Sequence, residues 1–98
     1  MKIKVQNDLI DIDQSITEYI QRMLRLGLSK YSTNISSINF LVSRVKEQRD
    51  KDDKHCVLTI TLVNRENIVA EETQPDLNFA IDRVIQKATR KITRKLLS

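Results

Sequence analysis

Two segments of the chain repeat their apolar residues every three or four positions, which is the period of an amphipathic α-helix. The first segment begins after Asp13 or Ser15, either of which can cap a helix, and it ends near Gly27. Ser15 and Glu18 have the spacing of a capping box. The second segment begins after Asp76, a further N-cap candidate, and runs towards the C-terminus. Each predicted helix therefore has one apolar stripe that requires a partner surface.

Four other segments alternate polar and apolar residues or are rich in β-branched residues, as strands are. The predicted strands cover residues 2–6, 38–45, 55–63 and 68–72. A polar connection at 32–37 leads into the second strand. The charged segment EQRDKDDK separates the second strand from the third, and these two most simply pair as a hairpin. The sequence NREN at 64–67 predicts a turn into the last strand.

The predicted order of elements is β-α-β-β-β-α, which belongs to the α+β class. A two-layer sandwich, with a four-stranded sheet and both helices packed on one face, is the simplest way to bury both helix stripes. A chain of 98 residues has room for one such core, so residues 1–98 are expected to form a single domain.

Positive charge is concentrated at the C-terminal end, in the segment DRVIQKATRKITRK at 82–95. Six cations follow Asp82 without any acidic residue: Arg83, Lys87, Arg90, Lys91, Arg94 and Lys95. None of them has an acidic partner four positions further along the helix. The chain as a whole has a net charge of only +4, so the remainder is close to neutral. Binding of a nucleic acid or another polyanion is favoured over a merely solubilising surface. A membrane-surface helix is the weaker alternative, because the helix has small apolar residues and no tryptophan.

Catalytic and metal-binding chemistry finds little support in the sequence. His55 and Cys56 are adjacent in a predicted strand and point to opposite faces, so they are poorly placed for a dyad, and Cys56 is expected to be buried. The acids Asp50, Asp52 and Asp53 are interrupted by lysines and lack the glycine of a calcium loop. We therefore expect no enzymatic activity, no metal and no cofactor.

The remaining global features indicate a cytoplasmic protein. A single cysteine excludes an intramolecular disulfide, and no apolar run is long enough to cross a bilayer. The first residues, MKIKVQND, are not followed by the hydrophobic region of a signal peptide. No membrane partner is expected.

The sequence also indicates which kind of nucleic acid the cations of the last helix would bind. Base-stacking sheets need exposed aromatic residues on their strands, and only Phe40 lies in a predicted strand. A GXXG loop cannot form, because Gly27 is the only glycine. A helix face of evenly spaced cations suits the phosphates and the shape of folded RNA.

The segment IVAEETQPDLNFAIDRVIQKATRKITRK at 68–95 resembles the ribosome hibernation promoting factor and ribosome-associated inhibitor A family, also called sigma-54 modulation proteins. Ala70 lies at the family's strand exit, Asp76 at its helix cap, and Ala80, Ile81 and Asp82 match its helix start. Lys87, Arg90, Ile92 and Arg94 fall in the family's register. Upstream, IDIDQSITEYIQRML is similar to the family's first helix, and LSKYSTNISSINFLVSRVKE to its helix end and second strand.

The resemblance implies a fold like that of double-stranded-RNA-binding domains and a bacterial ribosome-silencing function. Family members bind the small ribosomal subunit in the cleft for messenger and transfer RNA, and they silence ribosomes in stationary phase or stress. They silence the ribosome by occupying the site that messenger and transfer RNA need, without a chemical reaction. Both helices face ribosomal RNA, so the implied contacts are Lys87, Arg90, Lys91, Arg94 and Lys95 of the second helix, together with Arg22, Arg25 and Lys30 around the first. Arg83 belongs to the same predicted stripe.

Because the chain ends at Ser98, it resembles the short form of the family, without a C-terminal dimerisation domain. We expect a monomer off the ribosome, with a second ribosome modulation protein as a further candidate partner. Two positions depart from the family pattern. Phe79 is an aromatic displaced by one position, and Ala88 replaces a bulky apolar residue, for which Phe79 could supply the volume.

Two other functions remain open at this point. The chain could bind structured RNA in general, through the same cations. It could also be a protein-interaction module, because Val57, Thr59, Thr61 and Val63 lie on the sheet face opposite Cys56 and would be left uncovered.

Overall fold

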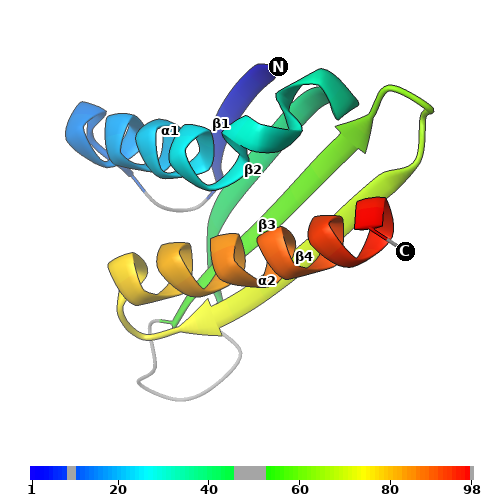
Figure 1. The fold of residues 1–98 in the computed structure, drawn as a ribbon. Helices are drawn as coiled ribbons and strands as arrows, with labels where there is room; N and C mark the ends of the chain where they lie inside the picture. The colour runs from blue at the N-terminus through cyan, green and yellow to red at the C-terminus, as the bar shows by residue number, and fades with distance from the viewer. Residues whose placement is uncertain (9–10, 46–52, 98) are drawn as a thin grey trace.

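The computed structural model describes residues 1–8, 11–45 and 53–97 and confirms the predicted order of elements (Figure 1). The elements are β1 (Lys2–Asp8), α1 (Gln14–Leu28), the 3-10 helix η1 (Ser29–Asn34), β2 (Ile35–Val45), β3 (Asp53–Leu62), β4 (Asn67–Gln74) and α2 (Leu77–Leu97).

The four strands form one mixed sheet in the order β1-β2-β3-β4. β1 and β2 are parallel, which requires a crossover, and α1 supplies it. β2 and β3 pair antiparallel, with Phe40 opposite Leu58, so the predicted hairpin is confirmed. β4 pairs antiparallel with β3, and it forms one edge of the sheet as β1 forms the other.

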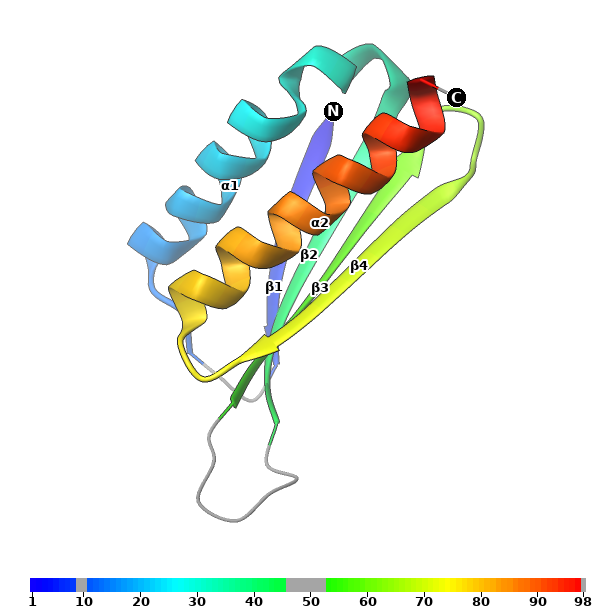
Figure 2. The ribbon, with the colours of Figure 1, turned by 60° about the horizontal axis from the view of Figure 1, so that its bottom comes forward.

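Both helices cover the same face of the sheet, as predicted (Figures 1 and 2). Alternate strand residues point towards them and are buried, including Ile38 and Phe40 of β2 and Leu58 and Ile60 of β3. The helices contribute their apolar stripes to this core; the buried residues of α2 are Ala80, Ile81, Val84, Ile85, Ala88 and Ile92. The opposite sheet face has no helix among the described residues.

The N-terminus of α1 is capped by Asp13, one of the two predicted candidates. The Asp13 carboxylate accepts a hydrogen bond from the backbone N–H of Ile16 at 2.9 Å. Ser15 lies inside the helix and donates its hydroxyl to the same carboxylate oxygen, so the predicted capping box of Ser15 and Glu18 is wrong. These hydrogen bonds favour the ionised carboxylate and lower the pKa of Asp13.

Two predicted boundaries need correction. The polar connection at 32–37 is a strand from Ile35 onward, because Ile35 is buried and lies opposite Leu62, so a core side chain outweighs its polar neighbours. The charged loop between the hairpin strands is shorter than predicted at its end, since β3 begins at Asp53. Residues 46–52, with Asp50 and Asp52, lie outside the described ranges.

The predicted N-cap of α2 at Asp76 is confirmed, because the Asp76 carboxylate accepts the N–H of Phe79 at 2.9 Å.

Phe79 does not fill the volume that Ala88 leaves. Ala88 is 0% exposed and faces the sheet, whereas Phe79 is 49% exposed on the outer side of the first turn of α2. The predicted compensation is therefore wrong. Small residues at Ala80 and Ala88 instead allow α2 to lie close to β3 and β4.

We expect Ala88→Leu to destabilise the fold by about 1–3 kcal/mol, because the added methyl groups must displace close-packed neighbours. Phe79→Ala, at a half-exposed site, should cost less than about 1 kcal/mol. Urea unfolding of both variants tests this. An Ala88→Leu variant as stable as the parent would show that a cavity lies beneath α2.

Candidate nucleic-acid interface

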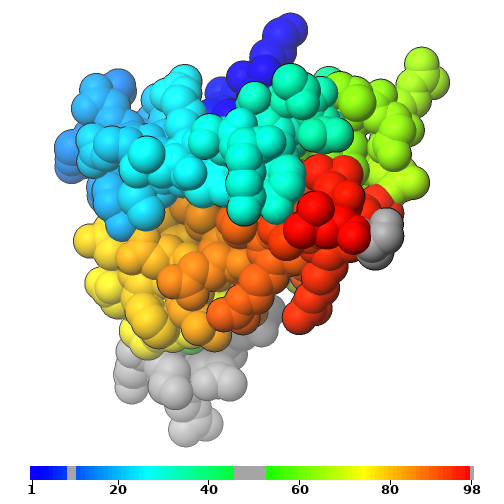
Figure 3. Space-filling view, viewed as in Figure 1, coloured from blue at the N-terminus to red at the C-terminus, as the bar shows by residue number. Residues whose placement is uncertain are grey.

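The two helices lie side by side and present one continuous outer face (Figure 3). One hydrogen bond joins α1 to α2, and a second joins η1 to α2. The Tyr19 hydroxyl donates to a carboxylate oxygen of Asp82 at 2.6 Å, and the hydroxyls of Tyr31 and Thr93 are 2.7 Å apart. The hydrogen bond to Asp82 raises the pKa of Tyr19, since it favours the neutral phenol. These bonds fix the distance between the helices, and with it the relative position of their side chains.

An apolar groove of about 450 Å³ runs between the helices, lined by Met23, Leu26, Gly27, Ile85, Gln86, Thr89 and Arg90. Leu26 is 70% exposed at its border. This groove was not predicted from the sequence, although Leu26, an apolar residue outside the apolar stripe of the predicted helix, could have indicated it.

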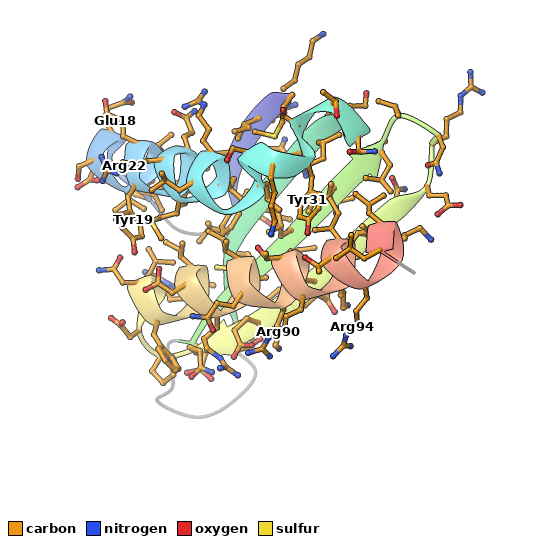
Figure 4. All side chains as sticks on the ribbon, in the orientation of Figure 1. Glu18, Tyr19, Arg22, Tyr31, Arg90 and Arg94 are labelled. Atoms are coloured by element: carbon orange, nitrogen blue, oxygen red, sulfur yellow. The ribbon has the colours of Figure 1, made fainter. Side chains whose placement is uncertain are left out.

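A second hollow, also of about 450 Å³, lies on the other side of α2 and is strongly basic. Its lining brings together four of the predicted site residues, Lys87, Arg90, Lys91 and Arg94, with one acid, Glu71. Arg90 and Arg94 are exposed, and both project from α2 on the side away from α1 in Figure 4. Neither arginine has an ion-pair or hydrogen-bond partner within residues 1–8, 11–45 and 53–97.

Unlike Arg90 and Arg94, the lysines of α2 contact β4 or the turn that precedes it. The Lys87 ammonium is 2.5 Å from a carboxylate oxygen of Glu72 and donates to the backbone carbonyl of Glu71 at 3.0 Å. Lys91 donates to the carbonyl of Val69 at 2.5 Å, and Lys95 forms an ion pair with Glu66. The helix itself supplies no acidic partner, as predicted, but Lys87 and Lys95 find theirs outside it, at Glu72 of β4 and at Glu66 just before β4.

The predicted cations of the first helix form a separate group. Arg22 and Arg25 are exposed on α1, and the Arg22 guanidinium lies 5.9 Å from the centre of the Tyr19 ring. Lys30 lies in η1, with its ammonium 5.2 Å from the centre of the Tyr31 ring. None of the three lines the basic hollow on α2. Arg83 lies near the start of α2, close enough for its charge to act on Glu72.

The structure places His55 and Cys56 on opposite sheet faces. Cys56 is fully buried, and burial, with a smaller effect of the Glu72 charge, raises its pKa to about 12. A thiol with such a pKa is not a nucleophile at neutral pH. His55 contacts the Thr73 hydroxyl at 2.7 Å through Nδ1 and the Glu71 carboxylate at 3.6 Å through Nε2.

The described residues contain no group of three or more His, Cys, Asp or Glu side chains arranged to hold a metal ion. No helix among them is both long enough and apolar enough to cross a membrane.

Glu72 is the one buried charged residue within the described ranges, at 9% exposed. Its carboxylate is held by the Lys87 ammonium and by the Gln74 amide, which donates to the second oxygen at 2.5 Å. These two partners lower the pKa of Glu72 below its ordinary value of 4.5. The ion pair thereby anchors α2 to β4.

We expect Glu72→Gln to reduce stability at neutral pH and to change its pH dependence. Because the pKa of Glu72 is lowered on folding, its ionised form stabilises the fold above the unfolded pKa of about 4.5, and this contribution is lost as the pH falls through the folded pKa. The difference in unfolding free energy between parent and variant should therefore shrink in acid. Urea unfolding at several pH values measures it, with Glu71→Gln as the exposed control. A difference that stays constant into acid would contradict the role of this pair.

Comparisons with known proteins agree with this geometry. A family model described as Sigma 54 modulation protein / S30EA ribosomal protein matches residues 3–96. A ribosomal subunit interface protein from Coxiella burnetii has a similar structure, with a TM-score of 0.85 and 17% identity over 100% of both chains. The N-terminal domain of Thermus thermophilus Protein Y is also similar, with a TM-score of 0.78 and 20% identity over 96% of this chain and 98% of that one. At these identities the two structures establish the fold.

No curated protein sequence matches the chain significantly. The family match covers nearly all of the chain and confirms the resemblance found in the sequence, so the chain belongs to the sigma 54 modulation protein / S30EA ribosomal protein family.

Proposed function

We propose that this protein is a ribosome hibernation factor. It binds the small ribosomal subunit in the cleft for messenger and transfer RNA, and it silences ribosomes in the bacterial cytoplasm during stationary phase or stress. Membership of the family supports a ribosomal role, and the structurally similar protein from Coxiella burnetii is itself described as a ribosomal subunit interface protein.

The observation that carries this proposal is the pair Arg90 and Arg94. Both are exposed at the rim of the basic hollow, one helical turn apart, and neither is used by the described part of the fold. A guanidinium can donate two parallel hydrogen bonds to one phosphate, so two unengaged arginines on a fixed helix suit a phosphodiester backbone. Lys87 and Lys91 of α2 also line the hollow and add positive potential to it, while their ammonium groups contact β4.

The mechanism is occupancy, with no chemical step. The folded domain fills the site that messenger and transfer RNA require, and the hydrogen bonds that join α1 and η1 to α2 keep its RNA-facing surface stiff. Arg22, Arg25 and Lys30 form a second group of phosphate contacts on the α1 side. Off the ribosome the protein is a monomer, and a second ribosome modulation protein acts beside it.

The central test is sedimentation of the protein with ribosomal subunits in a sucrose gradient at physiological salt. The parent protein should travel with the small subunit, and Arg90→Glu/Arg94→Glu should remain at the top, because reversing two charges lowers the net charge at the phosphate contacts by four units. The matched control is Lys2→Glu/Lys4→Glu, which makes the same charge change at exposed positions of β1, where Lys4 lies on the uncovered sheet face. This control should still sediment with the subunit.

Parent protein that stays at the top of the gradient would overturn the ribosomal proposal. Equal loss in both double variants would mean that net charge, and no particular surface, governs binding. Competition by ribosomal subunits against other structured RNA separates a ribosome-specific factor from a general RNA binder.

The salt dependence of binding gives an independent measure of the contacts. If about five cations meet phosphates, the slope of log affinity against log salt should be on the order of −4. Arg90→Gln should reduce its magnitude by about one, whereas Lys4→Gln should leave it unchanged. An unchanged slope for Arg90→Gln would show that Arg90 does not contact a phosphate.

A further inference from the structure

Three lysines of α2 lie along the outer edge of the sheet: Lys87 and Lys91 contact β4, and Lys95 contacts Glu66 just before it. Among the described residues β4 pairs only with β3, so one side of its backbone is not used by this sheet. The carbonyls of Val69 and Glu71 point to this unused side, since they accept hydrogen bonds from Lys91 and Lys87. In an antiparallel strand the N–H and C=O of one residue point the same way, so the N–H groups of these two residues also face outward.

The lysines follow the strand in register. Along α2 they recur every four residues, a rise of about 6 Å, and along β4 the outward carbonyls recur every two residues, about 6.7 Å apart. The contacts run from Lys87 to Glu71 and from Lys91 to Val69, and Lys95 then reaches Glu66 just before the strand begins. Because the spacing of the lysines nearly matches the spacing of the outward carbonyls, lysines on one side of α2 stay in register with the edge of β4, which runs in the opposite direction.

We propose that this lysine row (Lys87, Lys91 and Lys95) closes the β4 edge against pairing with β4 of a second copy of the chain. An open strand edge is a template for another strand, and lysine is a common means of blocking it. The same edge is present on every copy, so two of them can pair about a twofold axis with identical strands in contact. Two features of the row prevent this: Lys87 and Lys91 occupy outward carbonyls, and their side chains lie where a second strand would have to pair.

The lysines and the arginines of α2 therefore have different roles in this proposal. Lys87 and Lys91 extend their long stems past the helix to reach the strand, whereas Arg90 and Arg94 project from a neighbouring row into solvent. The blocking of the β4 edge takes place in the free protein and does not depend on ribosome binding, so it can be tested independently of the proposed function.

The test is sedimentation velocity over a wide range of protein concentration. Lys87→Ala/Lys91→Ala should shift from monomer towards dimer as concentration rises, while the parent stays monomeric. Arg90→Ala/Arg94→Ala is the matched control: it removes the same charge from the same helix and should stay monomeric. If the double substitution unfolds the protein, Lys91→Ala alone is the variant to use, because it keeps the ion pair between Lys87 and Glu72. It should also shift towards dimer as concentration rises. Lys91→Arg, which keeps a donor, should behave as the parent.

Amide hydrogen exchange then locates the contact. In the associated lysine variant the outward amides of Val69 and Glu71 should gain protection, because they become part of an intermolecular ladder. Val69→Pro added to that variant should restore the monomer, since proline removes an outward donor and leaves the pairing of β4 with β3 intact. Lysine variants that stay monomeric at every concentration would overturn the proposal. So would association without protection of these amides, or association that persists with Val69→Pro.

Discussion

The close approach of α2 to β3 and β4 is the constraint on which the rest of the structure depends. Ala80 and Ala88 are both fully buried on the side of α2 that faces the sheet, and larger residues there would hold the helix further out. At this short distance lysines from α2 can reach the backbone of β4, and the Glu72 carboxylate can be buried under an ammonium. The same packing turns Arg90 and Arg94 to the outside. The placement of the cations is thus a consequence of the small residues beneath them.

Periodicity was sufficient to predict the fold, because both helix stripes and the alternation in the strands are long and regular. The errors arose where a tertiary contact decided between local alternatives. Ile35 lies in a segment of polar residues, yet it is a strand residue because its side chain enters the core opposite Leu62. At the start of α1 both Asp13 and Ser15 were chemically suitable caps, and the position at which the chain leaves β1 could not be read from composition.

The site was predictable only as a set of cations. The sequence indicated which residues share a helix face, but it could not distinguish lysines that reach an edge strand from arginines that reach solvent, since this depends on how α2 lies over β4. Glu66, Glu71 and Glu72 were not among the predicted site residues, because they belong to another element and are distant in sequence. None of Arg22, Arg25 and Lys30 lines the hollow on α2. A basic stripe in a sequence therefore combines residues with different tasks.

The burial of Cys56 has a consequence for conditions that damage proteins. Oxidants and alkylating reagents attack the thiolate, and a fully buried thiol with a pKa of about 12 offers almost none at neutral pH. The core thus stays chemically inert as long as the protein stays folded. Once the sheet opens, the same thiol becomes accessible and ordinary in its reactivity. The only cysteine of the chain is consequently a natural label for the unfolded fraction, and the rate at which a small thiol reagent modifies it reports how often the core opens.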